Sequence, residues 1–197
     1  MLNSVSYKIS DFFIHNGKIQ SEDREVFAYG IRRLILNAFM MISFMCLGFI
    51  TNKLLEIGFF LVFFIPLRKY AGGFHFDNSV ICYVFSCLCV LVGAYMPTLI
   101  ENSGILQFVG VLSAASIFCF APVQDKHKEL SQNEKKVYKQ KTRKILIAYI
   151  LISAILLKYG MILFTKLIIM CLIEESLLVV FGAIKNFCYM CKITLGR

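Results

Sequence analysis

Apolar residues occupy six long runs along the chain, each separated from the next by a short polar segment. A helix of about 20 apolar residues crosses the hydrocarbon core of a bilayer, with a lower limit near 17. The runs cover residues 34–52, 54–67, 79–100, 105–123, 145–159 and 161–182. This pattern predicts an all-α, polytopic membrane protein with six transmembrane helices. The second and fifth runs are short, so their flanking lysines must extend to the membrane surface, or protein must shield these helices in part.

Ahead of the first run, apolar residues recur near helical spacing at Val5, Ile9, Phe12 and Phe13. Polar residues separate them, which is typical of an amphipathic helix that either lies in the membrane interface or packs on the protein. Residues 1–33 contain no compact apolar core followed by small residues, so we expect no cleavable signal peptide. We expect a single integral-membrane domain over residues 1–197.

The distribution of basic residues predicts the orientation of the helices. With six spans and both termini in the cytoplasm, 18 of the 21 lysines and arginines fall in cytoplasmic segments, two in external segments and Lys166 inside the last run. The positive-inside rule favours this arrangement. It also accounts for the net charge of +9 without nucleic acid as a partner, because the basic residues do not gather on one surface.

Composition supports a membrane protein without disulfide bonds. Hydrophobic residues make up 58% of the 197 residues and the mean hydropathy is +0.72, above the level of a soluble domain. Six of the eight cysteines lie inside apolar runs, and Cys188 and Cys191 lie in the basic tail. This is not the spaced framework of a secreted, disulfide-bonded scaffold.

One polar, glycine-containing segment between two apolar runs carries the strongest candidate chemistry. It extends from Arg68 through Gly72 and Gly73 to His75, and Cys82 follows seven residues after the histidine. A histidine beside a cysteine can generate a thiolate nucleophile. The alternative is a charged turn at the membrane surface, followed by a helix that contains one of eight cysteines. The pattern alone leaves both interpretations open.

The spacing favours catalysis only if the chain is bent between the two residues. In a straight helix they would lie about 10 Å apart along the axis, too far for proton transfer. However, Gly72-Gly73 should end the preceding helix, and Asp77-Asn78-Ser79 is a suitable N-cap cluster. A helix that begins near Asn78 places Cys82 in its first turn, where the helix dipole favours a thiolate, and leaves His75 on a segment that can fold back.

Other polar residues offer weaker alternatives. His75, Asp77 and Cys82 could each ligate zinc, but no further ligand pair completes such a site, so we expect no metal and no other cofactor. Cys188 and Cys191 form an isolated pair with metal-ligand spacing. Of the remaining histidines, His127 is a second candidate base, and His15 is expected to be an interface residue.

Three carboxylates interrupt the apolar runs, namely Glu56, Glu174 and Glu175. A charge in such a run is costly unless it faces protein or water. We expect Glu174 or Glu175 to form an ion pair with Lys166 or Arg68; a water-filled cavity is the alternative.

In the segment from Arg68 to Cys82 the chain resembles the accessory gene regulator B (AgrB) family of membrane-embedded cysteine endopeptidases. Five residues carry the resemblance: Arg68, Gly72, Gly73, His75 and Cys82. Tyr29-Gly30 and Ala121-Pro122-Val123 are weaker points of similarity, and the size, the six runs and the basic segment 124–144 agree with the family.

The resemblance implies an enzyme of the bacterial cell membrane with its active site facing the cytoplasm. Cys82 would be the nucleophile and His75 its base, while Arg68 would bind the acidic tail of the substrate or steady the site. The substrate would be a small AgrD-like quorum-sensing propeptide, whose C-terminal tail is released through a thioester acyl-enzyme before a thiolactone or lactone ring closes. Asp77 and Ser79 are candidates for further catalytic roles, although helix capping explains both. The lipid bilayer is a partner, and a homodimer is an open alternative.

Two other functions are compatible with the composition. A small transporter could line a path with Glu56, Lys166, Glu174 and Glu175, but the two halves of the chain show no convincing repeat. A scaffold could bind partners through the basic segment. Only the peptidase requires one fast-reacting thiol, at Cys82.

Overall fold

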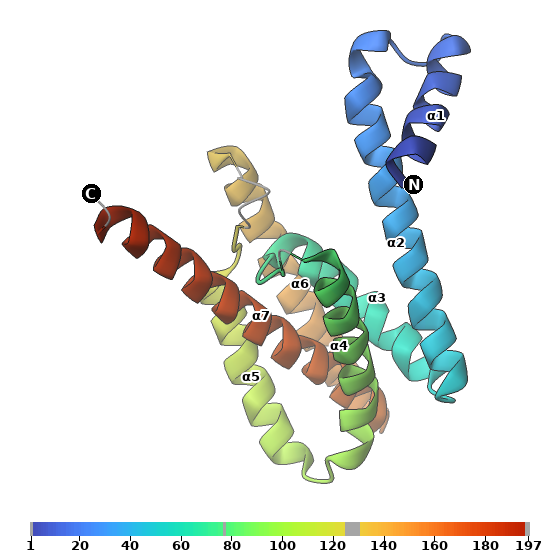
Figure 1. The fold of residues 1–197 in the computed structure, drawn as a ribbon. Coiled ribbons are helices and arrows are strands. Elements are labelled where there is room, and N and C mark those ends of the chain that lie inside the picture. The colour runs from blue at the N-terminus through green and yellow to red at the C-terminus, as the bar shows by residue number, and fades with distance from the viewer. Residues whose placement is uncertain (1, 77, 125–130, 196–197) are drawn as a thin grey trace. The chain divides into compact units, whose positions relative to one another are not determined.

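The computed structural model describes residues 2–76, 78–124 and 131–195, and within them all regular secondary structure is helical. The seven α-helices and one 3-10 turn are α1 (Leu2–His15), η1 (Ser21–Asp23), α2 (Arg24–Ile50), α3 (Leu54–Ala71), α4 (Ser79–Leu99), α5 (Ser103–Phe120), α6 (Gln132–Lys158) and α7 (Ile162–Leu195) (Figure 1). The prediction of an all-α protein is confirmed. The contacts divide the chain into two units, residues 1–46 and 47–197.

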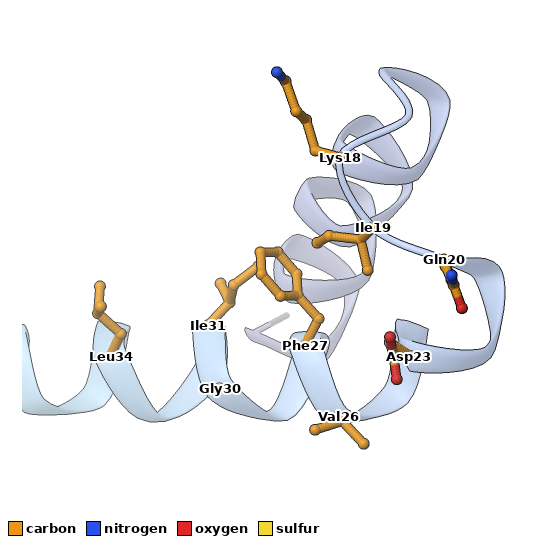
Figure 2. A pocket seen from close by; sticks show the side chains of 9 residues that line it. All are labelled: Lys18, Ile19, Gln20, Asp23, Val26, Phe27, Gly30, Ile31 and Leu34. Atoms are coloured by element: carbon orange, nitrogen blue, oxygen red, sulfur yellow. The ribbon is translucent and has the colours of Figure 1, made fainter.

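The first unit is a hairpin of α1 and the first part of α2. The Arg24 guanidinium donates two hydrogen bonds to the Asp11 carboxylate, at 2.6 and 2.8 Å, and the Ser10 hydroxyl donates to the Arg24 carbonyl oxygen. The hairpin borders an open hollow of about 770 Å³. Figure 2 shows Phe27 and Ile31 of α2 beneath Ile19 of the connecting segment.

Helix α7 forms the core of the second unit. It contacts α3, α4, α5 and α6 (Figure 1). In its most apolar 18-residue stretch 67% of the residues are buried, against 17% for α4 and 22% for α5. Many large apolar side chains on the other helices are exposed. A surface of exposed apolar side chains is stable only against another apolar phase. The helices around α7 therefore present a surface that suits the interior of a membrane.

Among the described residues, four helical segments are long and apolar enough to cross a membrane: Ser21–Ile50, Ser79–Leu99, Ser103–Phe120 and Ile162–Tyr189. The protein is therefore a multi-pass membrane protein. Helices α3 and α6 coincide with the other two predicted runs but differ in composition. Three charged residues lie within the 18 of α3, and α6 contains 13 uncharged residues between Lys144 and Lys158.

Several helices extend beyond the predicted apolar runs. Helix α6 begins at Gln132, within the segment predicted as the basic loop 124–144, because Ser131 and Glu134 form a reciprocal capping box. Helix α7 continues to Leu195, through most of the predicted basic tail. Apolar runs locate the membrane-embedded part of a helix, whereas caps determine where it ends.

Candidate active site

The chain leaves α3 through two glycines. Other residues could not adopt their backbone conformations without strain. Gly72 has φ +74° and Gly73 has φ +117°. A Cβ atom at Gly72 would lie 2.1 Å from the Val123 carbonyl oxygen, and one at Gly73 would lie 2.5 Å from Arg68 Nη1. The predicted break after α3 is confirmed, and both glycines also allow close approach of other groups.

Backbone hydrogen bonds attach this segment to two distant parts of the chain. Val123 N donates to Ala71 O at 2.9 Å and Gly73 N donates to Val123 O at 3.4 Å. Phe74 N donates to Leu178 O of α7 at 2.7 Å. Gly182, one turn after Leu178, leaves space for the segment, because a Cβ there would lie 2.8 Å from Phe74 N. We refer to residues 72–76 as the active-site strap.

Helix α4 begins where the sequence predicts. The Asn78 side-chain oxygen accepts hydrogen bonds from Val80 N at 2.8 Å and Ile81 N at 3.4 Å, and Cys82 N donates to Asn78 O. Asn78 is therefore the N-cap, Ser79 is the first helical residue, and Cys82 lies in the first turn. Asp77 lies outside the described residues.

The structure brings His75 and Cys82 together. His75 Nδ1 lies 4.0 Å from Cys82 Sγ, the outer limit for a hydrogen bond to sulfur. His75 is exposed and Cys82 is half-buried, so both are accessible from the surface. The pair forms because His75 lies on the strap, outside α4, and folds back over the first turn of that helix.

Arg68, in the last turn of α3, connects the strap to the histidine. Its guanidinium donates to Gly72 O at 2.6 Å and to Phe74 O, and its Nη2 lies 3.3 Å from His75 Nε2. Arginine can only donate hydrogen bonds, so Nε2 is the acceptor in this contact. A neutral imidazole in this arrangement carries its proton on Nδ1, the atom that faces Cys82.

Glu175 of α7 is fully buried and forms an ion pair with Arg68, with 3.7 Å between Oε1 and Nη1. The ion pair predicted for one of the two adjacent glutamates is thus present. Lys166 instead donates to Ile100 O at 2.6 Å. Glu174 is also buried. Within the described residues neither glutamate carboxylate has a hydrogen-bond partner, and the ion pair with Arg68 involves Glu175.

A second cation lies beside the strap. Lys185 Nζ donates to His75 O at 3.0 Å and lies 4.9 Å from the centre of the Phe74 ring. Lys185 thus adds a positive charge beside the strap, whereas Glu175 balances the charge of Arg68.

The other predicted site residues do not join this group. His15 ends α1 and is exposed, and Cys188 is exposed on α7. His127 and the side chain of Cys191 lie outside the described residues. Across the described ranges no three His, Cys, Asp or Glu residues are grouped to hold a metal ion.

Sequence reasoning did not identify Val123, Leu178 and Gly182 as parts of the site. Val123 and Leu178 contribute backbone atoms, for which a sequence carries no specific signal. Gly182 could have been noticed, because a glycine inside a long helix often marks a close backbone approach.

Comparisons with known proteins identify the family of the chain. The model of the family described as accessory gene regulator B matches residues 6–184. A protein of Clostridium perfringens strain SM101 named AgrB-like is 31% identical over 173 residues, covering 82% of this chain and 80% of its own length. A second AgrB-like protein, from strain 13, is 30% identical over 167 residues, covering 79% and 77%. No solved structure is significantly similar. The chain belongs to the accessory gene regulator B family.

Proposed function

We propose that this protein is a membrane-embedded cysteine endopeptidase that processes a small AgrD-like propeptide. The observation that carries the proposal is the 4.0 Å contact between Cys82 Sγ and His75 Nδ1 at the start of α4. The family takes part in processing quorum-sensing peptides, and its model spans both residues. A thiol in the first turn of a helix and beside an imidazole is suited to form a thiolate.

In the proposed reaction, the Cys82 thiolate attacks the carbonyl carbon at the end of the future signal sequence. The carbon–nitrogen bond breaks, His75 protonates the leaving amine, and the C-terminal tail departs, which leaves a thioester on Cys82. A cysteine or serine side chain of the propeptide then attacks the thioester and gives its proton to His75. Cys82 leaves as the thiolate, and the thiolactone or lactone ring closes. Exclusion of water favours this transfer over hydrolysis.

Arg68 acts as a positioning residue in this mechanism. Two of its contacts are to strap carbonyl oxygens, which supports a role in steadying the site. For His75 Nδ1 to accept the thiol proton, Nε2 must carry a proton, so the contact between Arg68 and Nε2 must lengthen at that step. Glu175 and Gly72 O retain the guanidinium while this happens.

The proposed topology has six spans with both termini and the active site in the cytoplasm. Helices α3 and α6 supply the two spans beyond the four apolar segments, and Lys144 and Lys158 extend towards the two membrane surfaces. The 18-to-2 distribution of basic residues supports this orientation. Exposed Val5, Phe12 and Phe13 support a position for α1 in the membrane interface.

A transporter receives less support. Lys166 donates to a backbone carbonyl oxygen and Glu175 is paired with Arg68, so neither lines an open path.

The test is cleavage of the propeptide encoded beside this gene, coexpressed with the protein in bacterial membranes. Cys82→Ala should abolish cleavage and His75→Ala should reduce it nearly as far, while both variants still insert. Cys87→Ala is the matched control on the same helix and should remain active. Normal cleavage by Cys82→Ala would overturn the proposal, and a loss only in Cys87→Ala would move the nucleophile.

A further inference from the structure

Helices α5 and α6 leave a groove between them that is separate from the strap. Each contacts α7 more extensively than it contacts the other, so α7 forms the floor of the groove. The groove has a volume of about 670 Å³ and is lined almost entirely by apolar or small side chains. Gly110, Ala114, Ala115 and Ala154 provide much of the space, because none carries a bulky side chain.

The dimensions of the groove suit a hydrocarbon chain. Its lining extends along α6 from Arg143 to Leu157. At 1.5 Å per residue this is about 21 Å, longer than the ~15 Å of one leaflet of a bilayer core. An acyl chain can therefore lie lengthwise against Ile147, Ile150 and the small residues of α5.

Of the described residues that line the groove, Arg143 alone is charged, and it lies at one end. Its guanidinium carbon stands 4.1 Å from the centre of the Phe118 ring. A guanidinium on an aromatic face keeps its N–H donors free to bind within its own plane. Within the described part of the chain, Arg143 Nε is buried and has no hydrogen-bond partner.

An unpaired buried donor is costly, and Nε together with a terminal nitrogen forms the fork that binds a phosphate through two hydrogen bonds. The preceding turns of α6 carry Lys136 and Lys139, and no acidic residue of the described ranges lines the groove. This end also matches the end of α5 that leads to Val123 and the strap.

We propose that the groove between α5 and α6 binds an anionic phospholipid, with one acyl chain along α5 and α6 and the phosphate on Arg143. The long apolar lining of the groove favours a lipid tail. The guanidinium of Arg143, whose Nε has no described hydrogen-bond partner, favours an anionic head. A zwitterionic lipid places a cation near the basic residues and should bind less well.

The experiment measures binding of phosphatidylglycerol and phosphatidylcholine with identical chains to the detergent-purified full chain, by native mass spectrometry and by the shift in Tm. We expect phosphatidylglycerol to bind about tenfold more tightly, since a charged hydrogen-bonded pair is at stake. Arg143→Gln should abolish the preference. Lys144→Gln, which removes the same charge one residue away on an exposed position, should keep it.

Three results would overturn the proposal. Equal binding of both lipids by the unaltered protein would remove the selectivity, and equal losses in the two variants would indicate diffuse surface attraction. Equal stabilisation by glycerol phosphate or by oleate would assign the site to a free phosphate or a fatty acid. If Arg143→Gln fails to fold, Arg143→Lys serves instead: it keeps the charge without the fork, so it should bind phosphatidylglycerol more weakly while still preferring it to phosphatidylcholine. Binding as tight as that of the unaltered protein would contradict the phosphate contact at Arg143.

Discussion

Gly182 of α7 and Phe74 of the strap are in backbone contact, and a Cβ atom at Gly182 would lie 2.8 Å from Phe74 N. Phe74 directly precedes His75, whose imidazole contacts Cys82. The position of the imidazole therefore depends on Gly182, about 100 residues further along the chain. Because this residue has no side chain, the strap can lie directly against α7.

Gly182→Ala should displace the strap and slow propeptide cleavage at least tenfold, while the protein remains inserted. The control is Gly58→Ala in α3, where an added Cβ meets nothing within 4 Å. That change should keep full activity and raise stability by about 0.5–1 kcal/mol. Both are measured by cleavage rate and thermal unfolding in detergent. Equal activity of the two variants would contradict the importance of this contact.

Glu175→Gln should lower kcat more than it raises KM, because the buried ion pair holds Arg68, which in turn contacts His75. Breaking a buried pair by removing one partner costs about 3–5 kcal/mol. Glu174→Gln is the matched control, because no described cation forms an ion pair with its carboxylate. It should retain near-normal kcat. A similar loss in both variants would point to general destabilisation of α7.

Cys82 should react with iodoacetamide faster than Cys89, which lies two turns deeper in α4. His75→Ala should reduce the rate at Cys82 and leave the rate at Cys89 unchanged. The measurement is mass spectrometry of labelled peptides over a range of pH. Indistinguishable rates for the two thiols would argue against an activated nucleophile at position 82.

Acid should loosen the contact between α1 and α2 at Asp11 and Arg24. The hydrogen bonds from Arg24 hold the pKa of Asp11 below its ordinary value of 3.8. A carboxyl group with a lowered folded-state pKa contributes stability above its ordinary pKa, and this contribution is lost as the pH falls through the lowered value. Spin labels at Lys8 and Arg32 should therefore keep one distance distribution at pH 5–8 and broaden it below pH 3. Asp11→Asn should remove the transition.

Tags at residue 1, within 132–140 and at residue 197 should be accessible only from the cytoplasm, whereas tags after Asn102 or Lys158 should be accessible from outside. The reason is the distribution of basic residues. Impermeant reagents on intact and opened cells provide the measurement. Labelling of the 132–140 tag on intact cells would overturn the six-span topology and the cytoplasmic site.

Local features of the fold and site were predictable from the sequence. Gly72-Gly73 and Asn78 specify a helix end and a helix start, which is why His75 could be expected to lie outside the helix that carries Cys82. The apolar runs located the helices. The start of α6 has a sequence signal of its own, because Ser131 and Glu134 have the spacing of a capping box.

Long-range contacts of the site were not predictable. Leu178 O and Val123 O hold the strap, and every residue has such a carbonyl oxygen. Their partners are determined by how α5 and α7 pack, which depends on the whole bundle. The pairing of Arg68 with Glu175 could be suggested only because a charge in an apolar run needs a partner.

The attachment of the strap to Leu178 has a consequence for biosynthesis. His75 and Cys82 leave the ribosome well before α7, and until α7 inserts the strap lacks the hydrogen bond to Leu178 O and the ion pair of Arg68 with Glu175. A nascent or C-terminally truncated chain would carry both side chains without the helix that fixes their geometry. The arrangement of the pair would thus be fixed only once α7 has been inserted.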